Sequence, residues 1–139
     1  MQVKTARRIA TIGVAVVLLL AAVTLLALEG GEVVILRTKA KGGVVRETRT
    51  WIADDAGGAW IEAASPTRPF FWDVVANPQV EVWRDGRWRR CHALVAANPA
   101  GHERVRHLLA GKYGWKDRWI GMLADTNESL GLRLSCEQA

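Results

Sequence analysis

The chain has 139 residues and a net charge of +5, a length that suits one domain and is too short for two well-packed ones. Three cations and no acidic residue precede residue 29, so the rest of the chain carries only +2, which argues against a nucleic-acid binder. Two cysteines, neither of them in a Cys-x-x-Cys pair, exclude a disulfide-rich scaffold.

The N-terminal segment contains an uncharged apolar run at residues 9–28. About 20 residues are needed for a helix to cross the hydrocarbon core of a bilayer. We therefore predict that residues 1–28 form a cytoplasmic flank and a transmembrane anchor helix, and that residues 29–139 form the domain. A cleaved signal peptide is the alternative, although no small-x-small cleavage site follows the run.

The side of the membrane on which the domain lies is less clear from the charges. Lys4, Arg7 and Arg8 crowd the N-terminal flank, which favours a cytoplasmic N-terminus and an external domain. However, four more cations lie between residues 37 and 46, within the range in which positive charge influences topology. The orientation stays open, with the external side favoured.

The first half of the domain contains three segments of high strand propensity, at residues 32–38, 44–52 and 59–64. A basic glycine-rich turn at residues 39–43 separates the first two, and an Asp- and Gly-rich turn at residues 54–58 separates the second and third. These short turns predict an antiparallel arrangement.

The second half continues this pattern after a proline-containing break. We predict a short helix at residues 70–76, hairpin strands at 80–83 and 88–96, a helix at 98–110, a loop or second short helix at 113–123, and a closing strand at 130–136. Pro78 ends the first helix, Gly86 marks the hairpin turn, and Asn98 is the predicted cap of the next helix. The fold class is therefore α+β: an N-terminal transmembrane helix, then an antiparallel sheet of about six strands, curled into a small barrel, with two helical segments.

The order of several short motifs carries a resemblance. They are residues 36–43 (LRTKAKGG), 45–48 (VRET), 64–65 (AS), 70–73 (FFWD), 76–82 (ANPQVEV) and 112–115 (KYGW). Together they resemble the deazaflavin-dependent nitroreductase family, which belongs to the flavin-binding split β-barrels related to pyridoxamine 5′-phosphate oxidase. The resemblance implies that the predicted barrel is a small antiparallel split β-barrel. The chain departs from that family in its basic turn, in a shortened loop at residues 65–69, and at Asp73, where Asn is common.

The basic turn is the predicted phosphate site. Lys39, Lys41 and Arg46 supply positive charge, and Gly42 and Gly43 allow the backbone N–H groups to approach an anion. From the residues alone, an ordinary solvated turn with surface lysines is the favoured interpretation, because such turns are common. The resemblance favours cofactor binding.

Further site residues are implied by the resemblance. Thr48, Ser65 and Thr67 are expected to bind the cofactor, the last two as hydrogen-bond donors to the ring edge of a flavin or deazaflavin. Trp72 and Tyr113 are expected to wall the ring or the substrate, with core packing as the alternative. The three histidines lack the spacing of a metal site, so no metal is predicted.

The resulting functional hypothesis is a membrane-anchored oxidoreductase that uses a deazaflavin (coenzyme F-420) or FMN. Its substrate would be a flat, electron-poor, lipophilic molecule such as a quinone or a nitroaromatic compound, taken from the bilayer. The alternative is an anchored, non-catalytic split-barrel module that has lost the cofactor. Because split barrels often dimerise, the resemblance also implies a homodimer.

The two cysteines bear on the compartment. Cys91 lies in the predicted strand after the Asp-Gly hairpin, and Cys136 lies in the closing strand. If these strands are neighbours, the two cysteines come within disulfide range. A domain outside the membrane would meet an oxidising environment, in which the disulfide would form. Two unrelated buried thiols in a cytosolic domain are the alternative.

Overall fold

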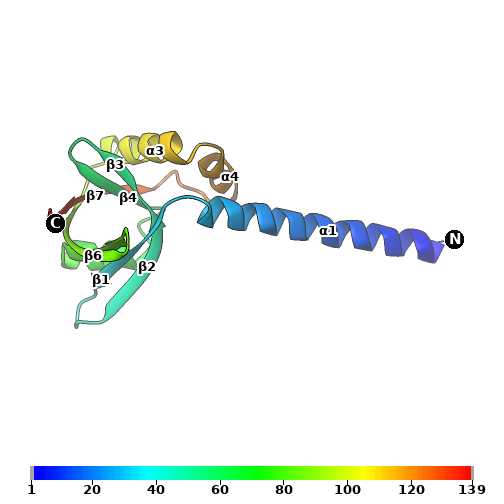
Figure 1. Ribbon diagram of the computed structural model, residues 1–139, viewed down its shortest axis with the longest axis horizontal. Coiled ribbons are helices and arrows are strands. Elements are labelled where there is room, and N and C mark those ends of the chain that lie inside the picture. The colour runs from blue at the N-terminus through cyan, green and yellow to red at the C-terminus, as the bar shows by residue number, and fades with distance from the viewer. Residues whose placement is uncertain (1, 139) are drawn as a thin grey trace.

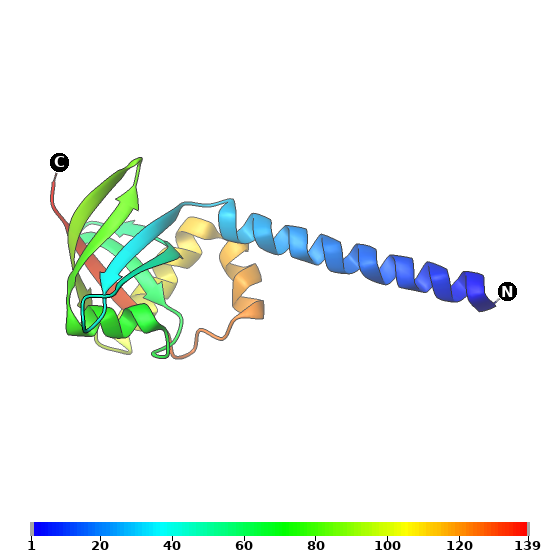
Figure 2. The same cartoon turned by 90° about the horizontal axis from the view of Figure 1, so that it is seen from below.

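The computed structural model describes residues 2–138, in which one long helix projects from a small β-rich domain (Figure 1). Helix α1 (Gln2–Glu29) has 28 residues and enters the domain at its C-terminal end only, as a second view also shows (Figure 2). Its most apolar part has a mean hydropathy of 2.8, and none of that part is buried. The helix is therefore long and apolar enough to span a membrane.

Seven antiparallel strands form one curled sheet, in the order β2-β1-β5-β6-β7-β4-β3. The strands are β1 (Val33–Lys39), β2 (Val45–Trp51), β3 (Ala53–Asp55), β4 (Gly58–Ala63), β5 (Gln79–Arg84), β6 (Arg87–Val95) and β7 (Leu130–Cys136). The curl brings β2 into contact with β4, although the sheet order separates them widely. The predicted α+β split barrel is confirmed.

Two counts differ from the sequence prediction. The sheet gains a seventh strand because β3 pairs with β4 on either side of the tight Ala56–Gly57 turn, where sequence analysis expected only a turn. Within residues 2–138, three helices follow α1 rather than two: α2 (Pro69–Ala76), α3 (Ala100–Tyr113) and α4 (Trp115–Leu123). Gly114, at φ 55°, separates α3 from α4, a conformation that glycine adopts without strain.

The core lies in two parts, one inside the curled sheet and one beneath α3. On β1, Val34, Leu36 and Thr38 alternate inward, and their neighbours point outward, as a half-buried strand requires. Under α3, Val105 and Leu109 pack with residues of β3 and β4. Helix α3 packs on the sheet here and contacts α4. Helix α4 in turn lies against the C-terminal end of α1.

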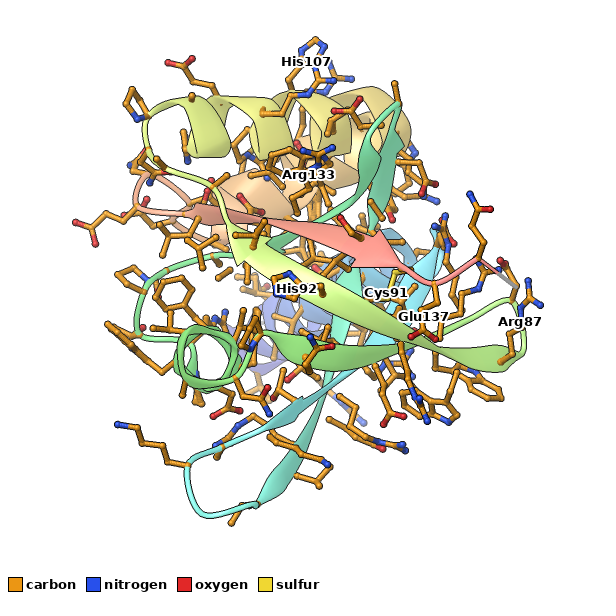
Figure 3. All side chains as sticks on the ribbon, turned by 90° about the vertical axis from the view of Figure 1, so that its left-hand side faces the viewer. Arg87, Cys91, His92, His107, Arg133 and Glu137 are labelled. Carbon is orange, nitrogen blue, oxygen red and sulfur yellow. A yellow bond between two sulfur atoms is a disulfide. The ribbon has the colours of Figure 1, made fainter. Side chains whose placement is uncertain are left out.

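The two cysteines are paired. Cys91 on β6 lies directly opposite Cys136 on β7 in the antiparallel register, and their sulfur atoms form a disulfide. Figure 3 shows this face of the sheet, with Cys91 on β6 beside β7. The sequence-based expectation that these strands are neighbours is therefore confirmed.

Candidate functional site

A cavity of about 630 Å³ lies where the sheet meets the C-terminal end of α1. One wall is formed by residues 46–51 of β2, and another by the segment that joins β4 to α2. Leu28, Leu109 and Ile120 add apolar side chains from three helices. Its volume falls within the range of about 300–1,000 Å³ that is usual for small-molecule sites.

The cavity follows a free strand edge. β2 is the first strand in the sheet order and pairs on one side only, with β1. Six consecutive residues of β2, with side chains on both faces, line the cavity, so it runs along the outer edge rather than over one face. Such an edge presents backbone N–H and C=O groups without a strand partner within the described residues. These groups can bind a planar polar ligand.

Arg46 is held at this cavity by a buried acid. Its Nε donates to Asp73 Oδ2 over 2.9 Å, and Thr38 Oγ1 donates to the same oxygen over 2.8 Å. Asp73 lies on α2 and is only 6% exposed, so the two donors compensate its desolvation. The guanidinium Nη atoms of Arg46 have no partner among the described residues and remain available to an anion.

The other charges of the cavity divide into paired and unpaired groups. Arg49 forms an ion pair with Glu29 at the end of α1. Arg68, in the loop before α2, has no ion-pair partner within the described residues. Arg68, which is unpaired, and Arg46, whose Nη atoms are free beside its ion pair with Asp73, are therefore the cations that we select to hold a phosphate group here.

Glu62 of β4 is a cavity residue that sequence analysis did not single out. Its Oε2 accepts a hydrogen bond from Arg106 Nη1 at 3.0 Å, and its Oε1 is buried without a partner in the described residues. Arg106 also donates to the buried Asp117 at 2.7 Å. The available signal was a lone acid within the apolar strand segment AWIEAA, where an unexplained buried charge is unusual.

The residues of the predicted phosphate site do not all meet. Arg46 and Thr48 line the cavity, whereas Lys39 borders a separate hollow beside β5. Lys41 and the two turn glycines are exposed at the tip of the β1–β2 hairpin and are not among the residues that line this cavity. Gly42 and Gly43 have φ values of 92° and 85°, so the turn itself requires glycine.

The remaining predicted residues have other surroundings. Ser65 and Thr67 share a 2.6 Å hydrogen bond in the loop whose ends border the cavity. Trp72 is 58% exposed on α2. Tyr113 is buried, stacks on Trp51, and shares its hydroxyl hydrogen between the carbonyl oxygens of Glu32 and Ile52. We therefore assign Tyr113 a structural role at the junction of α3 and the sheet.

Burial changes the acidity of Tyr113. Removal of its hydroxyl from water raises its pKa to about 12, despite the opposing hydrogen bond to the backbone of Ile52. The neutral phenol is therefore the form present throughout the physiological range. It acts as a fixed hydrogen-bonding link.

No protein-family model matches the chain, and no curated protein matches it. Solved structures with a similar fold include HutZ, a heme storage protein from Vibrio cholerae, with a TM-score of 0.58 and 14% identity over 86% of this chain and 90% of that one. A putative pyridoxamine 5′-phosphate oxidase from Listeria innocua has a TM-score of 0.53 and 16% identity over 86% and 94% of the two chains.

An F420-H2-dependent reductase, FDR-A, is similar as well, with a TM-score of 0.52 and 18% identity over 76% of this chain and 93% of that one. At these identities the likeness concerns the fold. The chain thus has the split-barrel fold of pyridoxamine 5′-phosphate oxidase-like proteins, a fold that it shares with F420-dependent reductases.

Proposed function

We propose that the chain is a membrane-anchored oxidoreductase that binds a deazaflavin (coenzyme F-420) or FMN along the free edge of β2 and reduces a flat lipophilic molecule such as a quinone. The observation that carries this proposal is the position of the cavity. It combines an unpaired strand edge, the unpaired Arg68 and the free Nη atoms of Arg46 with apolar side chains from α1 and α4. A flat, partly charged cofactor and an apolar substrate both find complementary groups there.

The residues present fit such a cofactor. Arg46, oriented by Asp73, and Arg68 would hold its phosphate. Thr48 and the backbone of β2 would bind the polar ring edge. When bound, the cofactor supplies hydride transfer. The protein binds and orients the cofactor and the substrate, and it excludes water from them.

The substrate side of the cavity is more apolar. Leu28 and Ile120 would contact a lipophilic ring and exclude water from it. The unpartnered Glu62 Oε1 would hydrogen-bond to a polar substituent of the substrate, such as the hydroxyl of a quinol. These residues replace Trp72 and Tyr113 in our assignment, because the first is exposed on α2 and the second is occupied by backbone contacts.

Titration of the purified full-length protein with FMN and with the deazaflavin tests the proposal. Arg46→Ala and Arg68→Ala should each weaken binding by about tenfold, since about 1.4 kcal/mol is lost with each partly exposed charge-assisted contact. Arg87→Ala is the matched control, because Arg87 is an exposed cation of the β5–β6 hairpin (Figure 3). Failure of the unaltered protein to bind either cofactor would contradict the proposal.

The same titration evaluates the basic turn. If the turn holds the phosphate, Lys41→Ala should weaken binding more than Arg68→Ala does. If Arg46 and Arg68 hold it, Lys41→Ala should behave like Arg87→Ala. The exposed position of Lys41, outside the cavity, favours the second result.

A non-catalytic anchored module is the second candidate. The TM-score with a heme storage protein, 0.58, is higher than that with the reductase, 0.52. Heme offered in the same titration would give a Soret absorption band if the cavity binds it. Heme binding without flavin or deazaflavin binding would favour this candidate.

A further inference from the structure

Helix α4 carries an apolar face that the domain does not cover. Trp115, Trp119, Met122 and Leu123 follow the i, i+4, i+7, i+8 spacing of one helix face. The exposed fractions of Trp115, Met122 and Leu123 are 48%, 73% and 63%. The opposite face carries Asp117, which is buried and hydrogen-bonded to Arg106. The apolar face therefore points away from the domain.

Hydrogen bonds join α4 to the C-terminal end of α1. Trp119 Nε1 donates to Thr24 Oγ1 of α1 at 3.0 Å, and Lys116 Nζ donates to the carbonyl oxygen of Gly30. Both ribbon views show α4 beside the C-terminal end of α1 (Figures 1 and 2). The position of α4 relative to the apolar run at residues 9–28 is therefore set by hydrogen bonds.

The depth of Thr24 follows from helix geometry. Thr24 precedes Leu28, the last residue of the apolar run, by four positions, which is about 6 Å along the helix axis. The headgroup region on each side of a bilayer is about 5–8 Å thick. If α1 spans the bilayer, Trp119 lies just inside the hydrocarbon boundary, and the rest of the α4 apolar face lies near that boundary.

We propose that α4 is a second membrane contact, with its Trp115–Trp119–Met122–Leu123 face embedded in the interfacial layer of the bilayer that α1 crosses. Two tryptophans on one short helix suit this layer, because the indole ring has an apolar body and a polar N–H. Lys116 and the exposed Arg118 flank the face and suit anionic headgroups.

This arrangement determines where the cavity opens. The cavity is lined by Leu28 and Glu29 of α1 and by Ile120 of α4, so its edge lies at the α1–α4 junction. With α4 in the interfacial layer, a lipophilic substrate enters from the bilayer without crossing water. The inference rests on the membrane anchoring in the proposed function, and not on the identity of the cofactor.

A depth measurement on the full chain tests the proposal. Leu123→Cys, labelled with an environment-sensitive fluorophore, is placed in vesicles of phosphatidylcholine and phosphatidylglycerol. The native cysteines form a disulfide, so the introduced thiol takes the label. Leu94→Cys is the matched control, since Leu94 is 59% exposed on β6, a strand on the side of the domain away from α1 (Figure 1).

The proposal expects the label at position 123 to be quenched by spin-labelled lipid and shielded from aqueous iodide, with the reverse at position 94. Equal iodide quenching at the two positions would overturn it. Shielding at position 123 without lipid quenching, and lost as protein is diluted into more lipid, would assign the face to a second copy and also overturn it. Release of the unlabelled chain from membranes by carbonate would instead remove the anchoring itself, and the inference with it.

Discussion

The ion pair between Arg46 and Asp73 joins α2 to the strands that build the cavity, and its removal has a calculable cost. Breaking a fully buried pair by deleting one partner costs about 3–5 kcal/mol. Here the Asp73 side chain is 7% exposed, and that of Arg46 is 41% exposed, so water screens the pair. We therefore expect Arg46→Ala to lower the free energy of unfolding by about 1–3 kcal/mol.

A double-mutant cycle separates the cost of leaving the Asp73 charge unpaired from the cost of lost packing around Arg46. In Asp73→Asn the side chain still accepts the Thr38 hydroxyl, and the partly exposed Arg46 is rehydrated, so the cost should be below about 1 kcal/mol. Combining Asp73→Asn with Arg46→Ala should restore stability relative to Arg46→Ala alone, because no buried charge is left unpaired.

The assay is urea unfolding of the full chain in mild detergent, followed by tryptophan fluorescence, with the slope m checked for constancy. Strictly additive losses in the double variant would refute the reasoning. They would show that Asp73 does not depend on Arg46 for its charge compensation.

Three further outcomes are expected. Tyr113→Phe should lower the free energy of unfolding by about 1–3 kcal/mol, because the Ile52 N–H loses its acceptor at 3.1 Å; an unchanged value would contradict the structural role. Arg84 lowers the pKa of Asp54 chiefly through a hydrogen bond, and with Lys112 it lowers that of Glu32 against the opposing effect of burial. Both carboxylates therefore contribute stability above about pH 4, and this stability is lost as the pH falls through their lower folded pKa values. Arg84→Gln should reduce this loss of stability in acid, measured as the free energy of unfolding against pH. An unaltered pH profile would count against the prediction. Maleimide labelling of denatured protein taken directly from cells should find no free thiol, and two labelled thiols per chain would exclude the disulfide.

Most strands could be predicted because the alternation of side chains and the turn residues indicated the same boundaries. The Asp85–Gly86 turn and the alternation of residues 130–136 predicted β6 and β7 to within a residue or two. β3 was missed because three residues are too few to show a period. The helix α4 was left open because its apolar face and Gly121 fit a loop and a helix equally well in sequence alone.

The site was less predictable than the fold. Arg46 and Thr48 lie in the cavity because β2 is an edge strand, and sheet order cannot be read from local patterns. Glu62 and Arg68 enter through long-range folding that brings β4 and the loop before α2 against β2. The predicted cofactor contacts of Lys39, Lys41, Ser65 and Thr67, and the homodimer, stay predictions.

Two of the seven tryptophans of the chain donate hydrogen bonds to the C-terminal part of α1. The last carbonyl groups of a helix lack intrahelical partners, and partners are scarce near a bilayer. Trp51 Nε1 donates to the carbonyl oxygen of Leu28 at 3.0 Å, and Trp119 donates to the hydroxyl of Thr24.

These two tryptophans come from β2 and α4, which are the elements that also line the cavity. Because the same elements hydrogen-bond to α1 and form walls of the cavity, the proposed anchor and the site are joined by direct contacts. A substitution such as Trp119→Phe would remove a hydrogen bond to the anchor while it leaves every cavity-lining residue in place. Its effect should therefore be greater on access from a bilayer than on binding of a water-soluble ligand.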